Sequence, residues 1–458
     1  MSKGAKLTRG SIRGHLIQQT APMIVGVAAI MSIGLVDAYF IGQLGSEELA
    51  AISFIFPISV ALTSLGVGVS VGINSVVARA LGSGEADRAK RRGSFGIVLA
   101  TLLGLAMGAL LFLALDPLFT LMQADARMLP LIRTYMQPFA LGFPLLMVIM
   151  GVNGVLRGQG EAKRTSLVSI TYAAANWVLD PILITGAFGF EGLGIVGAAY
   201  ATLAGWAVGL TLGFWLLSKT AIPFNLGKAM RTEWAESLKA ISRVAGPAAF
   251  SNAINPIGLS VLTALVAVEG QEALVPYSAL GRALSVVLAP LLGLSGAIGA
   301  IVGQNWGAGA PGRSRLAMLE AGGFAVTYGL LLAVVLFFSA EWFAGFFSQD
   351  PAVIGQFASY LRIAAWGYAG YGVLIVANGA LNAVDKSGWA LFQSFARVFL
   401  VMMPFAWLAR GTWGAEAIYA AELAANVLGG TAAALIVWRV LRRKPQQAQP
   451  SAQAEPAA

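Results

Sequence analysis

The sequence contains no cysteine, a single histidine and few charged residues. Without cysteine, the 458-residue chain forms neither a disulfide nor a thiolate metal site, and one histidine excludes a site with several histidine ligands. Charged residues make up 11% of the chain and hydrophobic residues 57%. A soluble domain carries about 25% charged residues, so this composition excludes an ordinary soluble protein and favours one that lies in a membrane.

Long apolar segments recur along the chain and are separated by short loops. A helix that crosses a bilayer needs about 20 predominantly apolar residues. Twelve segments reach this length, at 15–42, 47–78, 93–116, 129–156, 165–187, 192–217, 241–268, 274–305, 316–340, 354–384, 387–409 and 413–440. They are too long and too uniformly apolar for barrel strands, so the sequence predicts an all-α polytopic membrane protein with twelve transmembrane helices.

The chain also repeats itself with a shift of 225 residues. The matching positions include Pro22 with Pro247, Gly68 with Gly293, Gly82 with Gly307, Arg88 with Arg313, Tyr135 with Tyr360 and Asn153 with Asn378. This shift covers an even number of spans, so the halves have the same orientation and are related by pseudo-twofold symmetry along the membrane normal. We therefore expect two six-helix lobes, at 15–217 and 241–440, with a ligand cleft between them.

Three further segments complete the predicted organisation. Residues 1–14 form a cytoplasmic N-terminal segment, and residues 218–240 form a cytoplasmic linker. In this linker Trp234 and Leu238, followed by Ile241, have helical spacing with charged residues between them, which predicts an amphipathic helix on the membrane surface. The tail, 441–458, is of low complexity, and we expect it to be disordered.

The basic residues set the predicted orientation. They gather before the first span and in every second loop, for example at Lys6, Arg88, Lys228 and Arg313, whereas the alternate loops carry Glu47, Glu191 and Asp350. The positive-inside rule then places both termini in the cytoplasm, and we expect the protein in a bacterial cytoplasmic (inner) membrane. Because the net charge of +9 is spread over such short loops, it does not indicate a nucleic-acid partner.

Two carboxylates lie inside the spans of the first half. Asp37 is deep in the first span, which also contains Pro22, and Asp180 follows Asn176 by four residues in the fifth span, so the latter two share a helix face. Thr202 adds a hydroxyl in the sixth span. A carboxylate in hydrocarbon costs roughly 3 kcal/mol or more and is usually functional or paired. These oxygens can hold a proton or a Na⁺ ion, and the residue types alone do not decide between the two.

The second half has a different set of polar residues in its spans. Glu422, aligned on Gly194 and Gly414, falls opposite Thr202 and is a candidate for the cleft. An ion pair of Glu422 with Arg397 or Arg282 is the competing structural interpretation. Asn378, Tyr371 and Arg282 are the other cleft candidates of this half.

Several segments resemble the multidrug and toxic compound extrusion (MATE) family. They are VDAYFIGQLGSEELAA, VVARALGSGEADRA, NGVLRGQGEAKR and NWVLDPILI in the first half, and GQNWGAGAPGRSR and NGALNAVDKSG in the second. Their order and spacing cover about residues 10–440. The resemblance implies twelve helices in two lobes, and export of cationic or lipophilic compounds by H⁺ or Na⁺ antiport.

The resemblance also implies roles for individual residues. The family's first-span Asp matches Asp37, its fifth-span Asn and Asp match Asn176 and Asp180, its sixth-span Thr matches Thr202, and its bending proline matches Pro22. One large branch has a further seventh-span Glu and tenth-span Asp. Here those spans offer only Ser251 or Asn252, and Tyr371 or Asn378, so the chain resembles the DinF-like branch more closely.

Two other functions were weighed against a multidrug exporter. A flippase for lipid-linked or polysaccharide precursors would favour several Arg or Lys residues facing the cleft, and only Arg282 and Arg397 are candidates. An intramembrane enzyme is disfavoured because the chain has no cysteine, one histidine and no serine nucleophile motif. We therefore expect a monomeric transporter that is not an enzyme, contacts membrane lipids and small-molecule substrates, and needs no cofactor besides the coupling ion.

Overall fold

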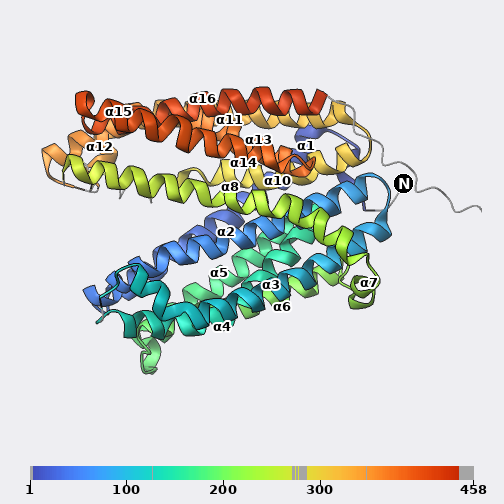
Figure 1. Cartoon of the computed structure of the whole chain (residues 1–458), viewed down its shortest axis with the longest axis horizontal. Coiled ribbons are helices and arrows are strands. Elements are labelled where there is room, and N and C mark those ends of the chain that lie inside the picture. Colours follow the sequence, from blue (N-terminus) through green and yellow to red (C-terminus); the bar gives the residue numbers. More distant parts are fainter. Residues whose placement is uncertain are drawn as a thin grey trace, which may run out of the picture.

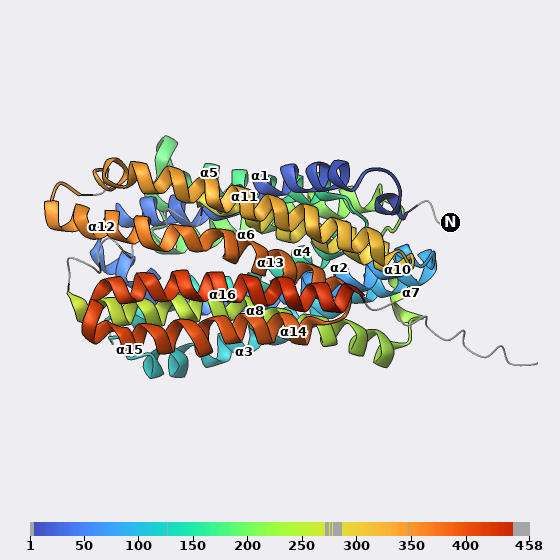
Figure 2. The same cartoon turned by 90° about the horizontal axis from the view of Figure 1, so that it is seen from above.

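The structure, a computed structural model, describes residues 4–125, 127–270, 274, 277, 286–346 and 348–442. All regular elements in these ranges are helices, and the long ones run side by side along the long axis of the molecule (Figures 1 and 2). Within the described part of the chain, 11 helices are long and apolar enough to cross a membrane. The predicted all-α membrane fold is confirmed.

The first lobe consists of six long helices. They are α1 (Ile12–Gly42), α2 (Ser46–Gly82), α3 (Ala86–Leu121), α4 (Leu129–Gly158), α5 (Ala162–Thr185) and α6 (Ile195–Ser218). Each coincides with one predicted span, but α2 and α3 extend past the predicted apolar limits at both ends. The first turn of α2 carries Glu47 and Glu48, whose charges interact favourably with the positive end of the helix dipole, so the helix continues into polar sequence.

The second lobe is built from α8 (Trp234–Glu269), α10 (Ala289–Gly307), α11 (Pro311–Ala344), α12 (Pro351–Ala364), α13 (Tyr368–Ala383), α14 (Ser387–Phe395), α15 (Met403–Trp413) and α16 (Ala415–Arg442). A 3₁₀ turn, Ala365–Gly367, joins α12 to α13, and a π-helical segment, Ala396–Met402, joins α14 to α15. The predicted tenth and eleventh spans therefore each contain a local change of helix type. The predicted eighth span, 274–305, falls partly outside the described residues and ends in α10.

The linker between the lobes differs in detail from the prediction. It contains one short helix, α7 (Leu226–Met230), capped by the Asn225 side chain. The stretch from Trp234 to Ile241 forms the first turns of α8 and is not a separate surface helix. No proline or glycine interrupts residues 234–245, so the helix of the seventh span extends back through them. Of the predicted tail, residues 443–458 lie outside the described part of the chain.

The two lobes meet through helix pairs related by the internal repeat. Figure 1 shows α2–α6 on one side and α8 with α11–α16 on the other. Across the boundary α2 packs against α8, and α1 packs against α10. A Cβ atom at Gly68 would lie 2.7 Å from the Ala249 nitrogen, and one at Gly293 would lie 2.9 Å from the Ile24 nitrogen. Each glycine thus allows the same close approach, because the positions are 225 residues apart on both sides.

A second symmetric pair of glycines lies at the end of the molecule that carries the Lys- and Arg-rich loops, here called the basic end. A Cβ atom at Gly82 would lie 2.1 Å from the Gln304 carbonyl oxygen, and one at Gly307 would lie 2.2 Å from the Arg79 carbonyl oxygen. Any side chain at either position would overlap the opposite backbone. The last turns of α2 and α10 therefore cross in direct backbone contact, which holds the lobes together at this end.

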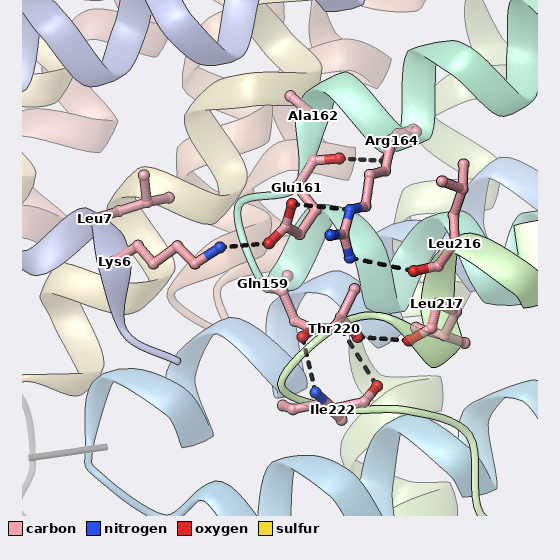
Figure 3. A network of polar contacts seen from close by, with 12 residues as sticks. Lys6, Leu7, Gln159, Glu161, Ala162, Arg164, Leu216, Leu217, Thr220 and Ile222 are labelled. Carbon is pink, nitrogen blue, oxygen red and sulfur yellow. Dashed lines mark hydrogen bonds and ion pairs between the residues drawn. The ribbon is translucent and has the colours of Figure 1, made fainter. Parts of the chain in front are cut away.

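The N-terminal segment adds a further link between the lobes at the basic end. Leu7 is buried in the second-lobe core, and its backbone nitrogen donates to Gln304 Oε1 at 3.1 Å. The same Gln304 side chain donates to the Gly158 carbonyl of the first lobe at 2.9 Å. Figure 3 shows Lys6 beside Leu7 pairing with Glu161 of the first lobe at 2.5 Å. One short segment thus contacts both lobes.

Candidate functional site

Three helices of the first lobe position the predicted ion-coupling residues. Asp37 is on α1, Asn176 and Asp180 are on α5, and Thr202 is on α6. The α5 helix packs against both α1 and α6, so its polar face lies between the other two helices. Asn176 and Asp180 are 1% and 0% exposed, in keeping with their four-residue spacing on one inward face.

The structure brings all four side chains into one cluster. Asn176 Nδ2 lies 3.1 Å from Asp180 Oδ1, to which it donates, and 3.5 Å from Thr202 Oγ1. The Asp37 carboxyl group lies next to Asp180 and Asn176. The two carboxyl groups, which are 143 positions apart in the sequence, therefore meet inside the lobe.

Several oxygens of this cluster have no hydrogen-bond partner among the described residues. They are Asp37 Oδ1, Asn176 Oδ1 and Asp180 Oδ2, all buried. Buried polar atoms in native proteins are nearly always paired, so unpaired oxygens that converge on one place indicate a site for a proton or a cation. The donors are oxygens alone, which suits H⁺ or Na⁺. In the described ranges no three acidic or histidine side chains gather as a metal site would require.

The sequence analysis did not assign Tyr135 of α4 to this cluster. The Tyr135 side chain is buried beside the Thr202 hydroxyl and close to both carboxylates. A signal for it existed, because Tyr135 and Tyr360 match in the internal repeat. Tyrosine is nevertheless common in helix interiors, so the match alone does not distinguish a site residue from packing.

In the second lobe, Glu422 of α16 has the partner that the repeat relates to Tyr135. The Tyr360 hydroxyl donates to Glu422 Oε2 at 3.0 Å. Glu422 thus stands to Tyr360 as Thr202 stands to Tyr135, in agreement with the alignment of Glu422 opposite Thr202. The suggested ion pair with Arg397 is not formed in the described part of the chain, and Arg282 lies outside the described residues.

Arg397 instead bonds neutral side chains. It lies in the π-helical segment and donates from Nη1 to Asn426 Oδ1 at 2.6 Å and from Nη2 to Asn255 Oδ1 at 2.5 Å. Its guanidinium group stacks over the Tyr371 ring, 5.1 Å from the ring centre. Tyr371, one of the predicted cleft residues, therefore contacts this arginine directly.

The other second-lobe candidates form a neighbouring polar chain. Gln393 donates to Asn378 Oδ1 at 2.5 Å, and Asn378 donates to Ser394 Oγ at 3.0 Å. Ser394 also lies 2.7 Å from the Ser251 hydroxyl. Asn252 is exposed and bonds only the Ala248 carbonyl of its own helix, so Ser251 is the seventh-span residue that joins this chain.

Comparison with known proteins is consistent with this arrangement. The sequence profile of the MatE family matches residues 22–182 and 247–408, two ranges that begin 225 residues apart. The chain is 34% identical to the FAD transporter of Shewanella oneidensis, over 93% of this chain and 94% of that protein. It is 24% identical to the multidrug export protein MepA of Staphylococcus saprophyticus, over 94% of each chain. A crystal structure of the Vibrio cholerae MATE transporter VcmN superposes with a TM-score of 0.89 at 27% identity, over 94% of this chain and 97% of that one.

Proposed function

The chain belongs to the MatE family of membrane transporters, and from this premise we propose that it exports small molecules by secondary active transport driven by H⁺ or Na⁺. The observation that carries the proposal is the convergence of Asp37 and Asp180 with their unpaired oxygens inside the first lobe. A buried pair of carboxylates is costly unless a proton or a cation neutralises it. The residues Asn176 and Thr202 assist by supplying further oxygens.

The mechanism that follows is an exchange between ion and substrate. In one state the pair binds H⁺ or Na⁺, and its negative charge is lost. A bound cationic substrate then loses electrostatic attraction and leaves outward. In the other state the ion is released to the cytoplasm, to which the positive-inside rule assigns the basic end. Exchange requires that ion and substrate favour different states, because a ligand that binds both equally shifts nothing.

Two substrate classes have support. Cationic or lipophilic compounds fit the carboxylates of the first lobe, and MepA is named as a multidrug export protein. A second class, phosphorylated flavins, is favoured by the Shewanella oneidensis relative and by the cationic Arg397 in the second lobe. The coupling ion acts in the first lobe in both cases.

The test of coupling is Asp37→Asn, measured as uphill efflux from proteoliposomes under an imposed pH or Na⁺ gradient. The amide keeps the shape of the side chain but cannot gain a proton or carry charge, so we expect ion-driven efflux to fall by at least about tenfold while the protein remains folded. Asp180→Asn should behave alike, and the double variant should be little worse than either, since both side chains act in one unit.

Asp116→Asn is the matched control, because it makes the same change at an exposed carboxylate of α3 that pairs with Arg133. It should leave efflux unchanged. Near wild-type uphill efflux by Asp37→Asn would contradict the proposal and would make Glu422 the next candidate.

A further inference from the structure

The second lobe contains a buried cation whose direct partners are all uncharged. The Arg397 side chain is only 6% exposed, yet both of its terminal nitrogens donate to asparagine amides. Its Nε has no hydrogen-bond partner among the described residues, and no described carboxylate lies within ion-pair distance of it. The nearby Glu422 accepts its hydrogen bond from Tyr360 instead. Removing one partner of a buried ion pair usually costs several kcal/mol, about 3–5, so a guanidinium group without an anion indicates a missing ligand.

The neighbours of Arg397 give the site a wall that a ligand can reach. Asn255 and Tyr371, which contact the guanidinium group, are only half-buried, as is Glu422. Arg397 therefore lies one layer behind accessible surface. Gln393, four residues earlier and on the same helix face, has an unpaired Oε1 that is also buried. Two unpaired polar atoms thus lie on one side of the helix, one a donor and one an acceptor.

The helix geometry at this position supports a binding role. Arg397 is the second residue of the π-helical segment Ala396–Met402. A π-helical turn is less stable than an α-helical one and occurs frequently at functional sites, where it redirects side chains. Here it directs the guanidinium group between α8, α13 and α16, from which Asn255, Tyr371 and Asn426 come.

We propose that Arg397, held by Asn255 and Asn426, binds a phosphate group of an aromatic anionic substrate of the phosphorylated-flavin class. A guanidinium group suits phosphate because it offers several N–H donors in a fixed plane. Tyr371 holds that plane by stacking and adds aromatic surface for a ring system. The inference rests on the proposed transport function and deepens it by naming where the anion of the second substrate class sits.

This assignment gives the two lobes opposite charge. The first lobe presents Asp37 and Asp180, which attract the coupling ion and repel phosphate, whereas the second lobe presents Arg397. An anionic substrate and a coupling cation can then occupy the protein in separate lobes. The charge of the coupling ion need not be displaced by direct contact with the substrate.

The test uses riboflavin, its 5′-monophosphate and FAD, which share one ring system and differ in phosphate. Binding to the purified full-length protein is followed by flavin fluorescence anisotropy, without an ion gradient. We expect the wild type to bind both phosphorylated flavins more tightly than riboflavin. Arg397→Gln should raise their Kd by about tenfold or more and leave riboflavin unchanged, because hydrogen bonds to a charged group contribute about 1.5–3 kcal/mol each.

Two further variants make the result specific. Arg362→Gln removes a positive charge from the same lobe at an exposed ion pair with Glu341, and it should change none of the three affinities. Asn255→Asp keeps the shape of the site but pairs Arg397 with a carboxylate, so it should weaken phosphorylated flavins as Arg397→Gln does. This variant also serves if Arg397→Gln fails to fold.

Three outcomes would overturn the proposal. They are no binding of phosphorylated flavin to the wild type, an equal loss for all three flavins, and displacement of FAD by phosphatidic acid in the micelle, which would assign the site to a lipid headgroup. The binding measurement does not depend on ion coupling, so a failure of the Asp37 proposal would leave its result unchanged.

Discussion

Matching tyrosines of the two lobes have different partners. Tyr135 lies beside the neutral Thr202, and Tyr360 donates to the carboxylate of Glu422. The scaffold has thus kept one hydroxyl at the same place in each lobe while the group opposite it changed. Because a carboxylate in an apolar interior needs donors more than a hydroxyl does, the two tyrosines contribute differently to stability.

Tyr360→Phe is therefore predicted to destabilise the protein. Both Tyr360 and its Glu422 contact are inside the second lobe, so loss of the donor leaves a buried acceptor unpaired, at a cost of about 1–3 kcal/mol. A lower Tm in detergent is the expected readout. Tyr39→Phe, at a tyrosine 66% exposed, is the control and should not change Tm. An unchanged Tm for Tyr360→Phe would mean that Glu422 is stabilised by other groups.

At the scale of elements, the two proline-bearing helices at the lobe boundary differ in one respect. Pro22 lies inside α1 and Pro247 inside α8, and both helices remain continuous in the structure. Each removes a backbone donor and makes a place where the helix can bend. Only α1 also carries a carboxylate of the ion cluster, so only there would bending move a titrating side chain.

Pro22→Ala should accordingly impair transport more than Pro247→Ala at equal expression. Alanine restores the backbone donor and stiffens the helix, which in α1 separates ion binding from movement. Efflux rates of the two variants in proteoliposomes provide the measurement, with Tm as a check on folding. Equal losses would show that bending at both helices serves movement alone, without a link to Asp37.

How far the sequence could predict these elements depended on the range of the signal. Apolar length predicted the spans, and four-residue spacing placed Asn176 and Asp180 on one face. The partners of Arg397 could not be predicted, because Asn255 and Asn426 come from helices far along the chain. The π-helical segment was also missed, since ARVFLVM has the composition of any apolar helix. The closer likeness to the DinF-like branch and the disorder of the tail stay predictions.

At the scale of the whole molecule, charge and symmetry fix how the chain sits in the membrane. Both described ends of the chain, α7 and the basic loops lie together at one end (Figure 1). Most of the ion pairs at this end join different segments, such as Arg92 with Glu236 and Arg13 with Glu320. In the linker, Lys228 lowers the pKa of the Asp87 carboxyl group through their hydrogen bond.

The predicted orientation can be tested with single cysteines, since the natural chain has none. The positive-inside rule predicts that Arg88→Cys is protected from an impermeant maleimide in intact cells, whereas cysteines at Gly45 and Gly270 are labelled. All three should react once the cells are opened. Labelling of position 88 from outside would reverse the assignment of both termini to the cytoplasm.

The backbone crossings at Gly82 and Gly307 limit the direction in which the lobes can move. Each glycine lies against a carbonyl of the opposite helix, so α2 and α10 cannot slide along one another without larger neighbouring residues meeting the same carbonyls. Sliding is therefore blocked in both senses, while separation at right angles to the helices is not. The symmetric pair acts as a mechanical stop that leaves rocking as the available degree of freedom.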